Sequence, residues 1–302
     1  MPRLLNRSLL TLLLPLTAGV VHAFETVRVA DGVYALVGDL GQRTPENLGH
    51  NMTSGFVVTA QGVVVIDTGA SKLGAQAIHT AIRKITGWPV IYAINTGGQD
   101  HRWLGNDYFR RQGAKLVASA AGLADMHNRG AEQMAMTGRF LKDKFAGTVP
   151  AYPDVTFKDR YTLPVKGERI ELIYTGGAHT PGDILVWLPQ RSIVFAGDTV
   201  FVQRLLGVLP GGARRWIKSL EYLRDQLKPK IVVPGHGHVT DLNEALREAV
   251  AKRFADGAFD PVEVSQCLDQ PCFKYLVNYD DLEFRSRNAL AVAEELLATQ
   301  SR

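Results

Sequence analysis

Five apolar, β-branched segments of this chain end in an aspartate or a histidine that lies close to glycine. They are VIDTGAS around Asp67, INTGGQDH around Asp100 and His101, GGAHTPGD around His179, FAGDTVF around Asp198 and VPGHGH around His236. Strand ends that share one edge of a sheet are where α/β proteins assemble sites, and glycine lets other backbone come close. The pattern therefore predicts a sheet protein whose polar groups converge at one edge.

The residue types at these strand ends indicate metal chemistry. Imidazole and carboxylate ligands suit zinc or a similar divalent metal. A histidine taken singly is more often a surface or core residue than a ligand. The repetition of histidine and aspartate in one strand-end context reverses that expectation, and we predict a metal site.

The remaining pattern predicts alternating strands and helices in one compact domain of layered helices and sheets. Residues 27–38 read as a strand pair that turns at Asp31-Gly32, and residues 54–71 read as a hairpin. Helical spacing follows up to Gly87, and a long, mostly helical stretch covers residues 120–145. We predict a main domain over residues 24–255 and a C-terminal appendage over residues 256–302.

Residues 1–23 have the features of a secretory signal. Arg3 and Arg7 precede the apolar run Leu9–Leu16, and the small-residue motif VHA precedes Phe24. The run is shorter than the roughly 20 residues of a membrane span, although an uncleaved anchor is the alternative. No later segment is long and apolar enough to span a membrane. These features predict a periplasmic or secreted protein.

Charge and cysteine content bound the possible partners. The formal net charge is only +4, and two of the arginines lie in the signal. A charge this small gives no reason to expect nucleic acid or an acidic membrane surface as a partner. The two cysteines, Cys267 and Cys272 in CLDQPC, favour a disulfide in an oxidising compartment. This pair alone is a poor metal site, because thiolate sites usually recruit further Cys or His nearby.

In their order and spacing, these motifs resemble the metallo-β-lactamase superfamily. The resemblance covers about residues 27–240 and rests on DGVYALVG, GFVVTAQGVVVIDTG, NTGGQDHRWLGN, HTPGDILVWLP, VFAGDTVF and VPGHG. A fainter likeness is to the periplasmic metallohydrolases that accompany quinoprotein dehydrogenase systems. The resemblance implies an α/β (α+β) fold, the four-layer αββα sandwich, with the metal site along one edge of the two sheets.

One loop departs from the family pattern N-T-H-x-H-x-D-H-x-x-G-N. Asn95-Thr96, Asp100-His101 and Gly105-Asn106 match it, but three residues instead of four separate Thr96 from Asp100, and both family histidines between them are missing. The resemblance implies that those histidines and the residue matched by His179 hold a first metal. A second metal is held by the residues matched by Asp100, His101 and His236, and Asp198 matches the bridging carboxylate. The first site is therefore expected to be lost and the second retained.

The leading hypothesis is an exported hydrolase that holds one zinc ion per chain. Its metal-ligand candidates are Asp100, His101, His179, Asp198 and His236. Asp100 and His179 are the catalytic candidates, with His179 as the general base. The substrate is a small molecule with an ester, amide or lactam-like bond. A non-catalytic binding protein on the same fold is the main alternative, and iron-dependent oxidation of a sulfur substrate is a third. The oligomeric state is not determined by the sequence.

Overall fold

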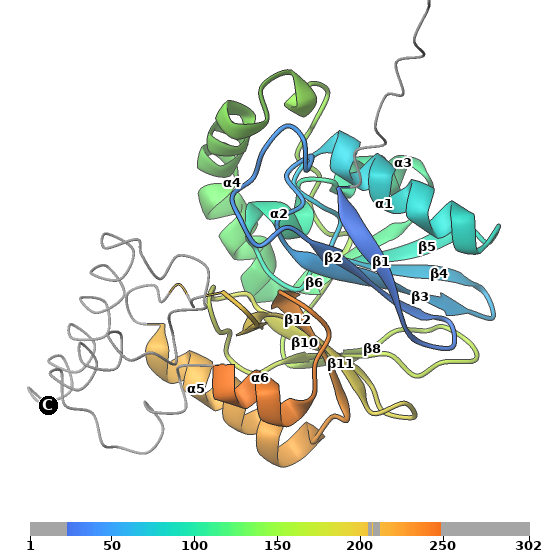
Figure 1. The fold of residues 1–302 in the computed structure, drawn as a ribbon, viewed down its shortest axis with the longest axis vertical. Helices are drawn as coiled ribbons and strands as arrows, with labels where there is room; N and C mark the ends of the chain where they lie inside the picture. Colours follow the sequence, from blue (N-terminus) through green and yellow to red (C-terminus); the bar gives the residue numbers. More distant parts are fainter. Residues whose placement is uncertain (1–22, 205–206, 208–211, 249–302) are drawn as a thin grey trace, which may run out of the picture.

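The computed structural model describes residues 23–204, 207 and 212–248, and two β-sheets form its centre (Figure 1). The first sheet has seven strands in sequence order, of which the first four pair antiparallel and the last four pair parallel. Its strands are β1 (Phe24–Ala30), β2 (Val33–Gly38), β3 (Thr53–Thr59), β4 (Gly62–Ile66), β5 (Val90–Ile94), β6 (Lys115–Ser119) and β7 (Val155–Phe157).

The second sheet has five strands in the order β12-β11-β10-β9-β8. Neighbours pair antiparallel except β11 and β12, which run parallel. The bounds are β8 (Arg160–Thr162), β9 (Glu171–Tyr174), β10 (Ile184–Leu188), β11 (Ile193–Phe201) and β12 (Ile231–His236). Every residue of β11 is buried, which places this strand and the aspartate within it inside the molecule.

The main core lies between the two sheets. Val64 and Ile66 of the first sheet share one buried cluster with Val186 and Phe195 of the second. Because side chains alternate between the two faces of a strand, the same strands also present apolar residues outward, to the helices. Two outer clusters join the first sheet to α1 and α3 and the second sheet to α5 and α6, and a smaller one joins β6 to α2 and α4.

Helices cover both outer faces of the sheet pair, as Figure 1 shows for α1 and α3 on one side and for α5 and α6 on the other. The helices are α1 (Lys72–Ile85), α2 (Asp100–Trp103), α3 (Asn106–Arg111), α4 (Ala120–Leu141), α5 (Ala213–Tyr222) and α6 (Leu242–Glu248). A 3-10 turn, Lys142–Phe145, follows α4, and a π turn, Leu223–Leu227, continues α5. The predicted four-layer αββα sandwich is confirmed.

The local predictions also agree with the observed elements where the structure describes them. The strand pair at 27–38 is β1 and β2, and the hairpin at 54–71 is β3 and β4. Within the described ranges, no helix has both the length and the apolarity needed to cross a lipid bilayer. Residues 1–22 of the predicted signal, the pair Cys267 and Cys272, and the predicted appendage from residue 256 lie outside the described residues.

Candidate metal centre

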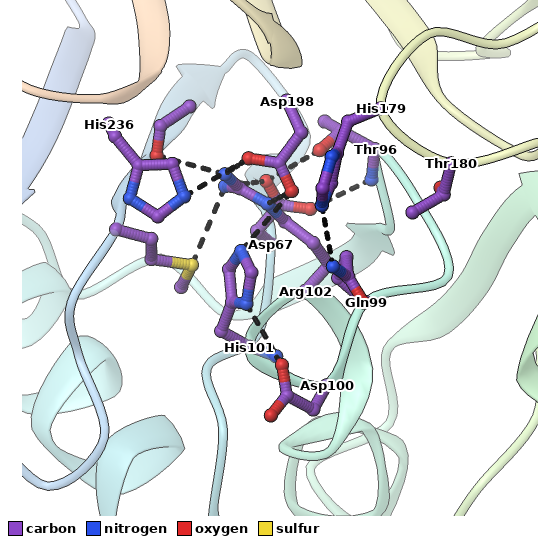
Figure 2. A network of polar contacts seen from close by, with 12 residues as sticks. Asp67, Thr96, Gln99, Asp100, His101, Arg102, His179, Thr180, Asp198 and His236 are labelled. Carbon is purple, nitrogen blue, oxygen red and sulfur yellow. Dashed lines mark hydrogen bonds and ion pairs between the residues drawn. The ribbon is translucent and has the colours of Figure 1, made fainter. Parts of the chain in front are cut away.

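Strand ends from both sheets meet at one edge and bring three ligand-type side chains together. His101 lies in α2, just after β5, whereas Asp198 lies in β11 and His236 ends β12. Each offers one ligand atom, and these atoms all lie within 4.8 Å of one another. Figure 2 shows both imidazole rings directed at the Asp198 carboxylate. We call these three residues the His-Asp-His cluster. All three are buried, and among the described residues they form the one such group of His, Cys, Asp or Glu.

The ring of His236 is held in one tautomer. Its Nδ1 donates to the carbonyl oxygen of Asn51 at 2.7 Å, so the neutral ring carries its lone pair on Nε2. That Nε2 lies 3.2 Å from Oδ1 of Asp198. Burial, and then the nearby Arg204, lower the pKa of His236 well below its usual value, which keeps the ring neutral. A lone pair that faces a carboxylate oxygen is repelled by it unless a cation lies between them.

His101 presents the same arrangement from the opposite sheet. Its Nε2 lies 3.3 Å from Oδ2 of Asp198 and is buried without a hydrogen-bond partner. Its Nδ1 lies 3.0 Å from Oδ1 of Asp100 and 2.7 Å from Nη2 of Arg43. A carboxylate accepts and a guanidinium only donates, so these two contacts require opposite tautomers. Metal binding through Nε2 requires the hydrogen on Nδ1, with Asp100 as its acceptor. A carboxylate commonly orients a metal-ligating histidine in this way.

Asp100 itself lies outside the His-Asp-His cluster. Its carboxylate accepts a hydrogen bond from Oγ1 of Thr137 at 2.8 Å and pairs with Arg43. Burial alone would raise the pKa of Asp100, but Arg43 and then His101 hold that pKa below its ordinary value. In this geometry Asp100 acts on the His101 ring and is not part of the group that could hold a metal.

Arg102, which the sequence analysis did not single out, lies fully buried beneath the cluster. Its Nη1 donates to Oδ2 of Asp67 at 2.8 Å, and its Nη2 donates to Oδ1 of Asp198 at 2.6 Å. Burial alone would raise the pKa of Asp198, but Arg102 and then His101 hold it well below its usual value. The carboxylate of the cluster is therefore ionised and fixed in position.

Asp67 fixes the loop that carries the cluster. It follows β4 with a positive φ of 64°. Its carboxylate accepts the backbone N–H of Thr96 at 2.7 Å and the Thr96 hydroxyl at 2.8 Å, in addition to Arg102. These bonds hold the start of the loop after β5 against the end of β4, and thereby set where α2 begins.

His179 lies in a separate hydrogen-bond chain, not in the cluster. Its Nδ1 contacts the carbonyl oxygen of Gly207, which can only accept, so Nε2 carries the lone pair. That Nε2 accepts from the amide nitrogen of Gln99 at 2.8 Å, and the amide oxygen of Gln99 accepts from Arg129 at 2.8 Å. Burial lowers the pKa of His179. The His179 ring is thus neutral, and the lone pair on its Nε2 points at the side-chain amide of Gln99.

Carboxyl groups fill the space beside the two glycines that follow Thr96. A Cβ on Gly97 would lie 2.3 Å from Oδ1 of Asp183, and one on Gly98 would lie 2.2 Å from Oδ2 of Asp125. Burial, and then the charge of Asp198, raise the pKa of Asp183 to about 8. A larger side chain at position 97 therefore has no room while Asp183 is in place.

Comparison with known proteins identifies the family. The family model described as "Metallo-beta-lactamase superfamily" matches residues 48–236. This chain belongs to the metallo-β-lactamase superfamily. The matched range includes every residue of the His-Asp-His cluster, and it begins before β3 and ends with β12.

Individual superfamily members are distant relatives of this chain. Metallo-beta-lactamase IND-1 of Chryseobacterium indologenes is 24% identical over 209 residues, which cover 66% of this chain and 80% of that protein. A type 2 metallo-beta-lactamase of Bacteroides fragilis is 28% identical over 137 residues, 43% of this chain and 53% of that protein. The solved metallo-beta-lactamase from Pontibacter korlensis superposes with a TM-score of 0.60 at 23% identity, covering 76% of this chain and 99% of that one. The structural likeness supports the shared fold.

The geometry favours a different reading of the superfamily loop from the one taken in the sequence analysis. Asn95 to Asn106 fit N-T-H-x-H-x-D-H-x-x-G-N from end to end with no gap. In this register Gly97 and Gln99 stand at the first two histidines, His101 stands at the aspartate, and Arg102 stands at the histidine that follows it. Asp100 then falls on an unspecified position, in keeping with its side chain lying outside the cluster. The alignment that pairs Asp100 and His101 with the family's Asp-His differs from this register by one position and needs a deletion before the pair and an insertion after it.

Proposed function

We propose that this chain is an exported hydrolase that holds one zinc ion with His101, Asp198 and His236. The observation that carries the proposal is the pair of buried imidazole Nε2 atoms that face one ionised carboxylate at 3.2 and 3.3 Å. A proton could relieve the repulsion at His236, but burial and Arg204 oppose protonation there. A divalent cation relieves it at both rings.

The donor set fits zinc. Two imidazole nitrogens and one carboxylate oxygen make three protein ligands, and catalytic zinc sites typically keep a fourth position for water or substrate. The unpartnered Nε2 of His101 is the free donor atom that such a site requires. The carbonyl of Asn51 and the carboxylate of Asp100 each accept the hydrogen on the other ring nitrogen, which directs both lone pairs at the same point.

Residues around the proposed zinc ion have separate roles in binding and catalysis. When bound, zinc supplies Lewis acidity, which lowers the pKa of a water molecule and polarises a substrate carbonyl. Arg102 keeps Asp198 ionised, and Asp100 orients His101 as a positioning residue. His179 is neutral, so it can accept a proton as general base once the Gln99 amide releases its lone pair. The Gln99 contact keeps that ring in place until then.

The substrate is proposed to be a small molecule with an ester, amide or lactam-like bond. The relatives in the superfamily include proteins named metallo-beta-lactamases, which supports a hydrolytic reaction at a carbonyl group. We also propose that residues 1–23 are removed on export and that the protein acts in the periplasm or outside the cell.

The test compares three histidine variants by elemental analysis and by hydrolysis of a panel of chromogenic esters and lactams. Wild-type protein should contain about one zinc per chain. His236→Ala should lose the metal and the activity together. His179→Ala should keep the metal and lose about 10²–10⁴-fold in rate, as expected for a general base. His238→Ala is the matched control, because His238 lies two residues further on, with a side chain that is 44% exposed.

Three outcomes would contradict the proposal. Two tightly bound metals per chain would mean that ligands outside the His-Asp-His cluster complete another site. Loss of metal in His179→Ala would make His179 a ligand. A zinc-loaded wild type that hydrolyses nothing in the panel would favour a non-catalytic binding protein on the same fold.

A further inference from the structure

Arg43 contacts the Asp100–His101 pair from outside the His-Asp-His cluster. It lies in the loop between β2 and β3, and its side chain is 13% exposed. One nitrogen, Nη2, makes both contacts: it pairs with Oδ1 of Asp100 and lies 2.7 Å from Nδ1 of His101. The Nε of Arg43 is buried and has no hydrogen-bond partner among the described residues. The printed contacts of this guanidinium with the metal centre therefore depend on a single nitrogen atom.

The contact with Nδ1 determines which ring nitrogen of His101 carries the hydrogen. A guanidinium nitrogen can only donate, so Nδ1 accepts, and the neutral ring then has its hydrogen on Nε2. That Nε2 faces Oδ2 of Asp198 at 3.3 Å and is one of the atoms proposed to hold zinc. A nitrogen that carries a hydrogen has no lone pair for a metal. In this tautomer His101 cannot act as a ligand.

Asp100 stabilises the opposite tautomer. Its Oδ1 lies 3.0 Å from Nδ1 of His101 and can only accept, so this contact requires the hydrogen on Nδ1 and leaves the lone pair on Nε2. Figure 2 shows the His101 ring between the carboxylates of Asp100 and Asp198. An N–H of Arg43 and an N–H of His101 cannot both lie along the 2.7 Å between the two nitrogens. Arg43 and Asp100 therefore compete for one ring nitrogen, and the change of tautomer leaves the charge of the ring the same.

The loop that carries Arg43 is a tight turn beside a cavity. The backbone N–H of Thr44 donates to Oδ1 of Asn47 at 2.9 Å, and the Asn47 side chain donates to the carbonyl oxygen of Gln42 at 2.9 Å. These bonds fix the backbone on both sides of Arg43. Thr44 and Asn47 also line a cavity of about 940 Å³ that borders β1 and α1. The turn therefore has room to carry Arg43 away from His101.

We propose that Arg43 is a positioning residue that holds His101 in the tautomer that cannot bind metal, and that zinc binding requires Arg43 to leave Nδ1. Because the contact and the zinc ion exclude each other, removing the contact should strengthen zinc binding. The contact is a hydrogen bond from a charged group, so the expected gain in affinity is roughly 10- to 100-fold. The consequence for zinc rests on the proposed function, whereas the choice of tautomer does not require a metal.

The first measurement determines the tautomer in metal-free protein. Long-range proton–nitrogen correlation NMR of the full chain without its signal shows which ring nitrogen carries the hydrogen, and His101→Gln identifies the signals of that ring. The hydrogen should lie on Nε2 in wild type and on Nδ1 in Arg43→Met. A hydrogen on Nδ1 of metal-free wild type would overturn the proposal, and so would an unchanged tautomer in Arg43→Met.

The second measurement is the zinc affinity, determined by competition with a chelator. Arg43→Met should bind zinc roughly 10- to 100-fold more tightly than wild type. Arg204→Met is the matched control, because Arg204 is also a cation beside the cluster, with its Nη1 3.4 Å from Nδ1 of His236. That Nδ1 already donates to Asn51, so Arg204→Met changes the charge without changing a tautomer and should raise the affinity less. An equal rise in both variants would be an effect of charge alone and would overturn the proposal.

A second background separates this role from a folding defect. Arg43→Met leaves the buried Asp100 carboxylate without its arginine, so the same comparison is made in an Asp100→Asn background, where that carboxylate is absent. Removing Arg43 there should still strengthen zinc binding, and the absence of any gain would overturn the proposal. A chain that takes up no zinc, but whose His101 hydrogen moves to Nδ1 in Arg43→Met, would refute the proposed function and keep the role of Arg43.

Discussion

Arg102 is a guanidinium without solvent contact between two aspartates that belong to different sheets. Asp67 follows β4 of the first sheet, and Asp198 lies in β11 of the second. Both carboxylates are buried, and among the described residues Arg102 is the arginine or lysine that ion-pairs with each of them. A buried ion pair that loses one partner leaves an uncompensated charge in a region of low dielectric.

Replacing Arg102 should therefore destabilise the fold more than replacing a surface arginine. Arg102→Met is expected to lower the free energy of unfolding by about 3–5 kcal/mol, measured by urea denaturation of the metal-free protein. Arg102→Lys should lie in between, because one ammonium group cannot form the same fork to both aspartates. Arg111→Met is the control, since Arg111 is 71% exposed and pairs with Asp107, and it should change the stability little. Equal losses in both variants would contradict this account.

At the scale of an element, the loop between β5 and α2 is packed into a hydrogen-bond network where the resemblance places the first metal. Arg129 fixes Gln99, Gln99 fixes His179, and Asp183 fills the space beside Gly97. Gly97 and Gln99 therefore do not leave an empty pocket where the two family histidines would lie. The side chains of Asp183, His179 and Arg129 occupy that space.

Restoring the histidines should not restore a second metal. Gly97→His/Gln99→His is expected to bind no more than about one zinc per chain by elemental analysis, because position 97 collides with Asp183. Gly97→Ala alone should lower the free energy of unfolding by about 1–3 kcal/mol, the usual range for overpacking. Gly87→Ala is the matched control, since its Cβ would meet nothing within 4 Å. Two zinc ions in the double variant would show that Asp183 moves aside.

The strands and helices could be predicted because the sequence patterns that define them are local. The register of the loop between β5 and α2 could not be predicted in this way. β-Branched runs and the Asp31-Gly32 turn define β1 to β4 without any knowledge of the partner sheet. The loop offers two alignments: one keeps the family's Asp-His pair but needs a deletion before it and an insertion after it, whereas the gapless one places His101 at the aspartate and Arg102 at the histidine. The direction of the side chains favours the gapless alignment, because His101 faces Asp198 and Asp100 faces Thr137. The burial of Arg102 depends on contacts with two sheets, which no local pattern contains.

At the scale of the whole molecule, the clustered ligands come from both halves of the sandwich. His101 belongs to the half built on the first sheet, and Asp198 and His236 belong to the half built on the second. The prediction that the protein is exported rests on the N-terminal signal, whose residues 1–22 lie outside the described residues.

Export carries a consequence for the two cysteines that can be measured on the whole protein. Cys267 and Cys272 should form a disulfide in an oxidising compartment, so thiol titration of denatured, unreduced periplasmic material should find no free thiol. The same material after reduction should give two thiols per chain, the number of cysteines in the sequence. Two free thiols before reduction would contradict both the disulfide and the case for export.

The buried position of Arg102 also bears on whether the chain folds before or after it binds a metal. In many small zinc proteins the ligands gather only when the metal arrives, so folding waits for it. Here a built-in cation already holds the Asp198 carboxylate between the sheets, and a large apolar core closes around it. If the His-Asp-His cluster takes up a metal, as proposed, the chain is therefore expected to fold first and to bind the ion afterwards, from the supply in its surroundings. The scarcity of that supply would then limit how much of the protein is loaded, while the amount that is folded would stay the same.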